Sequence, residues 1–378
     1  MSLWAYVPPF IGKYNLGHTL GKGSFSIVKE GQDIETQAHY AVKIIPKSNL
    51  NTEADIERFE REVRVLLKMD HPGIIKIYDF LVDSSYFYLI MDLCKGDTLL
   101  NRILQPGMMD EESAKPLFKQ ILDTVTYIHE KGIAHRDLKL DNVLVEPNGN
   151  IKIIDFGFSK FANPGQMCMT PCGSPVYAAP EILDGQSYDG KLADMWSCGV
   201  LLYCLVTGEL PWRSGNQMLV FNQIKKGSYD LPENLSENCK DLISKLLNSK
   251  PAERLTAVEA SNHPWLEGIK ITWPRHNENR RSISENTFVS LLNKSNHSSE
   301  EENQKLDPRE VLKQIGTRSR IKSTHNGSFS FGSKSIPPMS GSIVRFGGTI
   351  VRESSFNHRN INLRRNSYVK SSNSSVEQ

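Results

Sequence analysis

Residues 135–157 read HRDLKLDNVLVEPNGNIKIIDFG, and this stretch decides the fold. Two apolar runs, Val143–Val145 and Ile151–Ile154, flank a turn that contains Asn148-Gly149. Asn-Gly between two apolar runs is a strong signal for a β-hairpin. The sequence therefore predicts two short antiparallel strands, with polar residues gathered at the outer end of each strand.

Those polar residues have the chemistry of a metal and phosphate site. The hairpin would bring Asp137 and Asn142, before its first strand, close to Asp155, after its second. Two carboxylates and an amide supply only oxygen ligands, which suit a hard divalent cation such as Mg²⁺. Lys139 lies among them and can bind a phosphate. The stretch thus predicts phosphoryl transfer.

A glycine-rich loop lies near the start of the chain, in the pattern Gly21-x-Gly23-x-x-Ser26. Glycines let the backbone approach a phosphate closely and expose its N–H groups. The alternative is a glycine-rich hairpin with no ligand. A dinucleotide-binding fold is disfavoured, because Ser26 replaces the third glycine and a strand from Val28 follows where a helix should begin.

Lys43 lies in the middle of the apolar stretch Tyr40–Ile45. A lysine buried there without a partner would be costly, so it either lies at a surface edge or points into a cleft toward a carboxylate. The next segment begins with Thr52 and Asp55 in a pattern typical of a helix capping box. We expect Glu62, beside the apolar stripe of that helix, to be the partner of Lys43.

The pattern changes from strands to helices near residue 94. Residues 74–80 and 86–93 are expected to be strands, residues 94–97 a linker, and residues 113–131 a helix that stops at Gly132. A small β-rich lobe followed by a helical lobe places a cleft at residues 92–97. Clefts at such boundaries are favoured ligand sites.

Charge divides the chain into an acidic body and a basic tail. Residues 1–268 contain 27 Lys+Arg against 34 Asp+Glu, a net charge of −7, and residues 269–378 contain 18 against 9, a net charge of +9. The tail could bind the body. Membrane or nucleic-acid binding by the tail rests on charge alone, and we expect neither a nucleic-acid partner nor a membrane span.

The six cysteines fit neither a zinc site nor a disulfide framework, so free thiols in a reducing compartment are expected. The first ten residues, MSLWAYVPPF, lack the pattern of a signal peptide. We therefore expect an intracellular protein, cytoplasmic or nuclear.

Taken together, the ordered motifs resemble those of eukaryotic protein kinases over roughly residues 14–266, and Lys139 resembles the serine/threonine branch. The resemblance rests on several segments in their usual order. They are Gly21–Val28, Ala41-Val42-Lys43, Glu62, His135–Asn142, Asp155-Phe156-Gly157 and Ala179-Pro180-Glu181. Residues 172–181 and 262–265 resemble the calcium/calmodulin-dependent group, near the AMP-activated kinases. The implied fold is α+β and bilobal, with an N-lobe at 14–93 and a C-lobe at 97–266, after an N-terminal extension at 1–13.

The resemblance implies a serine/threonine protein kinase that uses ATP and Mg²⁺. Asp137 would orient the substrate hydroxyl and accept its proton, and Lys139 would offset charge on the moving phosphate. Lys43 would hold the α- and β-phosphates and pair with Glu62. Asn142 and Asp155 would bind the metal ions.

The same resemblance implies the contacts to ATP. The loop Gly21, Lys22, Gly23, Ser24, Phe25, Ser26 and Ile27 would cover the phosphates. Leu20, Val28 and Ala41 would sandwich the adenine, Met91 would lie behind it, and the backbone of Asp92 and Cys94 would bond its edge.

Residues 155–181 resemble an activation loop. Thr170 lies where this family is often phosphorylated, and Arg136 would receive the phosphate. An upstream activating kinase is thus an expected partner; the alternative is an unmodified surface threonine. Glu181 and Arg254 resemble the family's structural ion pair, and Asp194 resembles the anchor of its catalytic loop.

Protein substrates are expected, with a preference for basic motifs that the sequence supports only in part. Thr98 stands where many relatives carry a glutamate that reads a substrate arginine, although Asp97 is adjacent and Asp141 occupies the other usual acidic position. A non-catalytic scaffold is disfavoured by the full set of catalytic residues. A small-molecule kinase is disfavoured by residues 170–181, which resemble a peptide-docking surface.

Residues 267–378 form a basic tail with 21 serines in its last 110 positions, a composition that predicts disorder over most of its length. Residues 307–316 read as a short helix and residues 284–294 as a weaker helical candidate containing Phe288, Leu291 and Leu292. We hypothesise that the tail contacts the kinase domain, in its substrate groove. A linker or docking arm is the alternative.

Overall fold

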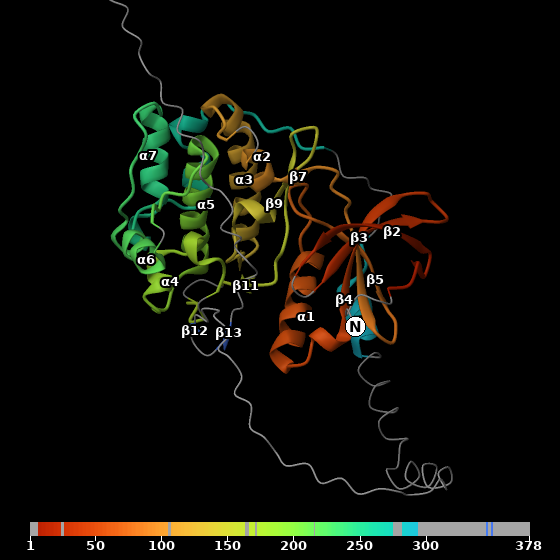
Figure 1. Ribbon diagram of the computed structural model, residues 1–378. Helices are drawn as coiled ribbons and strands as arrows, with labels where there is room; N and C mark the ends of the chain where they lie inside the picture. The colour runs from red at the N-terminus through yellow and green to blue at the C-terminus, as the bar shows by residue number, and fades with distance from the viewer. Residues whose placement is uncertain are drawn as a thin grey trace, which may run out of the picture.

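The computed structural model describes residues 7–23, 26–104, 107–162, 166–170, 172–214, 216–274, 282–293, 345–346 and 349–350. Ser24 and Phe25 of the predicted phosphate-covering loop, and the helix predicted at 307–316, lie outside these residues. The body has two lobes, one rich in strands and one helical, as the reddish and the olive-to-green parts of Figure 1 show.

The N-lobe is built on a six-stranded antiparallel sheet in the order β1-β2-β3-β4-β6-β5. The strands are β1 Phe10–Ile11, β2 Tyr14–Lys22, β3 Ile27–Asp33, β4 His39–Pro46, β5 Ile77–Val82 and β6 Tyr86–Met91. The strand predicted at 74–80 begins three residues later than expected. Ile74 instead makes an isolated bridge to Ile153 in the C-lobe.

Alternation along β4 divides the sheet into two faces. Tyr40, Val42 and Ile44 pack in a separate cluster with Tyr86, Tyr88 and Ile90 of β6. The intervening residues, including Lys43, therefore face the other way. That face is covered by helix α1, Glu53–Leu67, whose buried residues are Phe59, Val63, Val65 and Leu66. The predicted capping box of Thr52 and Asp55 is present at its start.

The C-lobe is organised around two long helices, α3 Glu111–Glu130 and α5 Gly190–Thr207. Asp110 caps the start of α3, two residues earlier than predicted, and nearly all of α5 is buried because other helices surround it. The other C-lobe helices are α2 Leu99–Leu104, α4 Pro180–Leu183, α6 Gln217–Lys226, α7 Glu237–Leu246 and α8 Ala257–Ser261, with short 3₁₀ turns at Pro175–Tyr177, Pro251–Glu253 and Pro264–Leu266.

The predicted hairpin is confirmed by strands β9 Val143–Val145 and β10 Ile151–Ile153, which pair antiparallel with Ile151 opposite Val145. Gly149 in its turn has a φ of +85°, a conformation that favours glycine. Strand β7, Asp97–Thr98, extends this sheet by pairing with β9. The two-residue strands β8 Ile133–Ala134 and β11 Lys160–Phe161, which lie on either side of residues 135–157 in the sequence, pair with each other.

The structure describes several segments after the C-lobe. Trp273 donates a hydrogen bond from Nε1 to Asp123 Oδ2 on α3 at 2.8 Å. Residues 285–293 form a helix, in agreement with the weaker helical candidate, and it lies against the N-lobe, in cyan in Figure 1. Strands β12 Arg345–Phe346 and β13 Thr349–Ile350 form a small antiparallel pair. Within the described residues no helix combines the length and apolarity needed to cross a membrane.

Candidate active site

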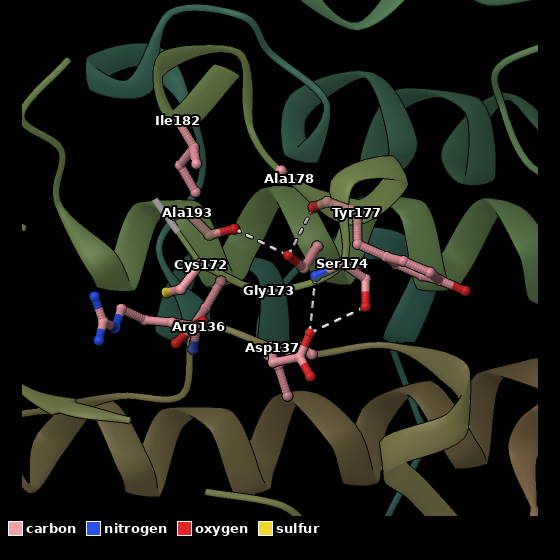
Figure 2. A pocket seen from close by; sticks show the side chains of 12 residues that line it. Arg136, Asp137, Cys172, Gly173, Ser174, Tyr177, Ala178, Ile182 and Ala193 are labelled. Carbon is pink, nitrogen blue, oxygen red and sulfur yellow. Dashed lines mark hydrogen bonds between the residues drawn. The ribbon is translucent and has the colours of Figure 1, made fainter. Parts of the chain in front are cut away.

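Asp137 lies at the centre of a hydrogen-bonded cluster between residues 137–142 and residues 172–177. Its Oδ2 accepts from Lys139 Nζ at 3.0 Å and from Asn142 Nδ2 at 3.1 Å. Its Oδ1 accepts from the backbone N–H of Ser174 at 3.0 Å and from the Ser174 hydroxyl at 3.2 Å. Figure 2 shows the carboxylate of Asp137 turned toward Ser174, while the Arg136 side chain points away. A hydroxyl oxygen can therefore approach this carboxylate within hydrogen-bond distance.

Asp194 of α5 holds the backbone at this point. Its carboxylate accepts from the N–H of His135 at 2.8 Å and from the N–H of Arg136 at 2.7 Å, and its side chain is 1% exposed. Arg136 and Asp155 both have positive φ, +65° and +64°. Non-glycine residues adopt this conformation only where their surroundings impose it, and such residues cluster at functional sites.

The space behind Asp137 is filled. The cavity between the Arg136–Leu138 backbone, Cys172–Ser174 and the start of α5 has a volume of about 10 Å³. A volume of this size holds at most one water molecule. The loop of residues 172–174 is therefore packed tightly on the backbone of residues 136–138, and a ligand has to approach Asp137 from the opposite side.

Asn142 and Asp155 offer oxygen ligands on that side. Asn142 donates its amide hydrogens to the carbonyl and the carboxylate of Asp137, which leaves its amide oxygen as a ligand. Burial acts against the charge of Asp155, but Lys43 and His135 outweigh it and lower the pKa of its carboxyl. No group of three His, Cys, Asp or Glu side chains within the described ranges could hold a metal ion. Asn142 and Asp155 thus offer two oxygen ligands of the kind that a hard divalent cation prefers.

Lys43 makes the expected contact with Glu62. Nζ of Lys43 on β4 lies 2.5 Å from Oε1 of Glu62 on α1, with side chains 21% and 13% exposed. Burial opposes the lysine charge, but the carboxylates of Glu62 and Asp155 raise its pKa. Lys43 is therefore a fixed cation that lies between α1 and the Asp155 end of the hairpin.

Strand register gathers the expected nucleotide contacts on one face. Val28 of β3 lies opposite Lys43 of β4, and Ala41, two residues before Lys43, lies opposite Met91 of β6. Directly opposed residues of an antiparallel pair point to the same face, as do residues two apart in one strand. Val28, Ala41, Lys43 and Met91 thus share the face that looks toward the C-lobe.

The glycine-rich loop is the turn between β2 and β3. Gly21 lies opposite Val28, and the N–H of Gly23 donates to the carbonyl of Ser26 at 2.8 Å. A Cβ atom added to Gly21 would meet nothing within 4 Å, so the space over this loop is open. Leu20, which precedes it, is 43% exposed and can contact a ligand.

The side chain of Asp92, whose backbone is expected to bond the adenine edge, makes its hydrogen bonds within the protein. Its carboxylate accepts from Lys152 Nζ at 2.9 Å, from Tyr78 OH at 2.6 Å and from the N–H of Lys76 at 3.1 Å. Its own N–H donates to the carbonyl of Lys76 at 3.0 Å, so the backbone carbonyl is the group left for a ligand. Cys94 is half-buried, and burial raises the pKa of its thiol.

Thr170 is exposed and is linked to Arg136 through one side chain. The Tyr188 hydroxyl donates to the carbonyl of Thr170 at 3.1 Å and accepts from Arg136 Nη1 at 3.3 Å. Arg136 also donates from Nε to the carbonyl of Phe158 at 2.7 Å. The guanidinium therefore connects the residue after the Asp155-Phe156-Gly157 motif to the expected phosphorylation site.

Two residues at the site had no role in the sequence analysis. Ser174 bonds both Asp137 and Lys139, with its hydroxyl 3.1 Å from Lys139 Nζ. Arg58 on α1 donates from Nε to the carbonyl of Gly157 at 3.1 Å and stacks over the ring of Phe158, 3.9 Å from its centroid. Arg58 lies one helical turn before Glu62, and this spacing was the available signal.

Comparisons with known proteins agree with this geometry. Residues 14–266 match the model of the protein kinase domain. The chain is 39% identical over 264 residues to CBL-interacting serine/threonine-protein kinase 1 of Arabidopsis thaliana, covering 68% of this chain and 59% of the relative. It is 36% identical over 285 residues to serine/threonine protein kinase OSK3 of Oryza sativa subsp. indica, covering 74% of this chain and 56% of the relative.

A third relative, CBL-interacting protein kinase 21 of Oryza sativa subsp. japonica, is 37% identical over 259 residues, which are 68% of this chain and 49% of the relative. The chain thus spans about half to three fifths of the length of the curated relatives it matches. The match covers both lobes and every motif of the site described above. The chain therefore belongs to the protein kinase family.

Proposed function

We propose that this chain is an ATP-dependent protein kinase that phosphorylates serine and threonine hydroxyls. The observation that carries the proposal is the cluster at Asp137, in which a carboxylate, the Lys139 ammonium and a hydroxyl lie within 3.2 Å of one another. The Lys43–Glu62 contact, present in the same structure, also supports a site arranged for phosphoryl transfer.

In the proposed reaction the substrate hydroxyl oxygen attacks the γ-phosphorus of ATP while the bond from that phosphorus to the β–γ bridging oxygen breaks. The hydroxyl proton passes to the Asp137 carboxylate, and ADP leaves. Lys139 lies 3.0 Å from that carboxylate and offsets negative charge on the transferring group. Lys43 holds the α- and β-phosphates, so the protein acts by positioning and by charge.

For the nucleotide, we infer that the backbone of Gly21–Ile27 covers the phosphates and that Leu20, Val28, Ala41 and Met91 enclose the adenine. The carbonyl of Asp92 and the backbone of Cys94 would bond its edge. The family implies a divalent metal, and we infer Mg²⁺ from the oxygen ligands of Asn142 and Asp155. When bound, the metal neutralises charge on the β- and γ-phosphates.

A basic recognition motif on the substrate is a finer proposal. Asp141, beside the catalytic loop, is exposed and available to a substrate arginine. Asp97 is also exposed but its Oδ1 already accepts from Asn101 at 2.7 Å, so Asp141 is the stronger candidate. A positional-scanning peptide library in which arginine before the phosphoacceptor gives no gain would remove this part of the proposal.

Phosphorylation of Thr170 by an upstream kinase is the proposed activating event. Thr170 is exposed, and Tyr188 already links its backbone to the guanidinium of Arg136. A phosphate there could form charge-assisted hydrogen bonds with Arg136. The six free cysteines support a reducing compartment, and we infer a cytoplasmic or nuclear location.

Transfer of radiolabelled phosphate from ATP to protein and peptide substrates tests the main proposal. We expect phosphoserine and phosphothreonine from the wild type and a loss of about 10²–10⁴-fold in Asp137→Asn, since the base is removed. Asp230→Asn, the same change at an exposed position of the C-lobe, should keep full activity. Absence of transfer by the wild type, after treatment with an activating kinase, would leave a non-catalytic scaffold as the better description.

A further inference from the structure

The helix at 285–293 contacts the N-lobe through an aromatic cluster. Phe288 is 0% and Leu292 2% exposed, as low as residues of the domain core. The ring of Phe288 lies 4.9 Å from Phe80 of β5 and 6.2 Å from Phe59 of α1, both edge to face. Phe59 also stacks on Phe87 of β6 at 5.3 Å. A side chain from outside the kinase domain therefore completes a cluster built from α1 and two strands.

Polar contacts fix the same segment along α1. Glu285 lies 3.7 Å from Arg64 Nη1 and 3.6 Å from Lys68 Nζ, at the C-terminal end of α1. Ser282 donates its hydroxyl to the carbonyl of Ile77 at the start of β5. Ser284 begins the helix, because its hydroxyl accepts from the N–H of Thr287 at 3.1 Å. The exposed ion pairs are individually weak, so Phe288 and Leu292 supply most of the contact.

One turn of α1 separates the contact made by Phe288 from the Lys43–Glu62 ion pair. Phe59 lies three residues before Glu62 on α1, so the residue that meets Phe288 and the residue that meets Lys43 are adjacent on the helix surface. Arg58, on the same turn, holds the carbonyl of Gly157. Rotation or outward movement of α1 would break both of these contacts. Phe288 opposes such movement because it packs against Phe59 of α1 and Phe80 of β5.

We infer that residues 282–293 contribute to the activity of this kinase. In this inference Phe288 is a positioning residue that, through α1, keeps the carboxylate of Glu62 in contact with Lys43. The segment lies at α1 and β5, away from Asp137, so it does not act by filling the substrate groove. This inference rests on the proposed kinase activity, and it places residues 282–293 of the tail at α1 and not in the substrate groove, where the tail contact was expected.

The test compares full-length Phe288→Ala with the wild type and with Phe10→Ala, which removes the same ring from a position that is 62% exposed. We expect kcat to fall about ten-fold or more in Phe288→Ala, because the catalytic groups are misplaced, with KM for the peptide substrate within about two-fold of the wild type. Phe288→Leu, which keeps an apolar side chain, should retain most of the activity. A synthetic peptide of residues 282–294 added in trans should restore kcat to Phe288→Ala, and a peptide with the same substitution should not.

Amide hydrogen exchange of α1 is the second measurement, and it does not require activity. Exchange over residues 53–67 should become faster in Phe288→Ala and remain unchanged in Phe10→Ala. Unchanged kcat and unchanged exchange in Phe288→Ala would overturn the inference, as would a rise in activity. If the wild type has no activity, the proposed function fails, while the exchange of α1 still decides whether Phe288 holds this helix. If Phe288→Ala does not fold, Leu292→Ala, which truncates the second buried residue of the segment, takes its place in both measurements with the same outcomes.

Discussion

The Glu181–Arg254 and Lys43–Glu62 ion pairs both join separate parts of the chain. They differ in how deeply the side chains are buried and in the number of hydrogen bonds that hold them. Glu181 and Arg254 are 7% and 0% exposed, and two N···O contacts of 2.8 and 3.1 Å join them. Arg254 also donates to the carbonyls of Leu192 and Asn248. Lys43 and Glu62 are 21% and 13% exposed and meet through one contact of 2.5 Å.

This difference in burial determines whether each ion pair can open in the folded protein. The Glu181–Arg254 pair is enclosed within one lobe, so it cannot open unless the C-lobe unfolds around it. The Lys43–Glu62 pair joins strand β4 to helix α1 and is partly exposed, so movement of α1 can break it while both lobes stay folded. The first pair is a structural element and the second is an adjustable part of the active site.

Removing Arg254 should have the largest effect on stability. Arg254→Met leaves the Glu181 carboxylate buried without its partner, which costs about 3–5 kcal/mol. Chemical denaturation of the full chain measures the loss. The double variant Glu181→Leu/Arg254→Met removes both charges and should be more stable than Arg254→Met alone. Equal stability of Arg254→Met and the wild type would contradict the structural role of this pair.

Lys43→Met should instead abolish activity and spare the fold. We expect kcat/KM for ATP to fall about 10²–10³-fold, because a preorganised cation at the phosphates is lost. The unfolding midpoint should change little, since the Lys43 side chain is partly exposed. Lys250→Met, at a side chain that is 73% exposed, is the matched control and should leave both quantities unchanged. A variant that loses stability as severely as Arg254→Met would erase the distinction between the two pairs.

Thr170→Ala tests whether the active-site pair is under control of the activation loop. After treatment with an activating kinase, the wild type should be about ten-fold or more active than Thr170→Ala, since one charge-assisted hydrogen bond is worth about 1.5–3 kcal/mol. Arg136→Lys, which keeps the charge but not the two-pronged guanidinium, should lose part of the same gain. Equal activity of the treated wild type and the treated Thr170→Ala variant would show that activity does not depend on a phosphate at Thr170 bound by Arg136.

Removing an exposed ion pair should have the smallest effect on stability. It gives a reference value for the Glu181–Arg254 and Lys43–Glu62 pairs. Glu209 and Arg213 lie 2.9 Å apart but are 41% and 57% exposed. Glu209→Gln should change the free energy of unfolding by no more than about 0.5 kcal/mol, because solvent screens the pair. Denaturation in low and high salt measures this change. A cost near that of Arg254→Met would mean that distance, and not burial, decides what an ion pair contributes.

Local signals predicted much of the fold and of the site. The Asn148-Gly149 turn predicted the hairpin because apolar runs on both sides leave few other structures. The capping box at Thr52 and the apolar stripe predicted α1 and placed Glu62 at the edge of its buried face. In each case a short pattern and a fixed backbone period were enough.

Contacts between residues far apart could not be predicted in the same way. Ser174 meets Asp137 across 37 positions, and only the path of the intervening chain brings them together. The docking of Phe288 on Phe59 and Phe80 was missed for another reason. The prediction of disorder used the composition of the whole tail, in which serines and charged residues far outnumber Phe288 and Leu292. These two residues lie one helical turn apart, and both are buried.

The anchoring of Trp273 on α3 and of Ser282 on β5 has a kinematic consequence. The lobes are connected at residues 92–97 and again by the stretch of chain between these two anchors. The nine residue steps from Trp273 to Ser282 limit the separation of their Cα atoms to about 30 Å, even when fully extended. The two lobes therefore cannot move further apart than this at the two anchors while both hydrogen bonds remain.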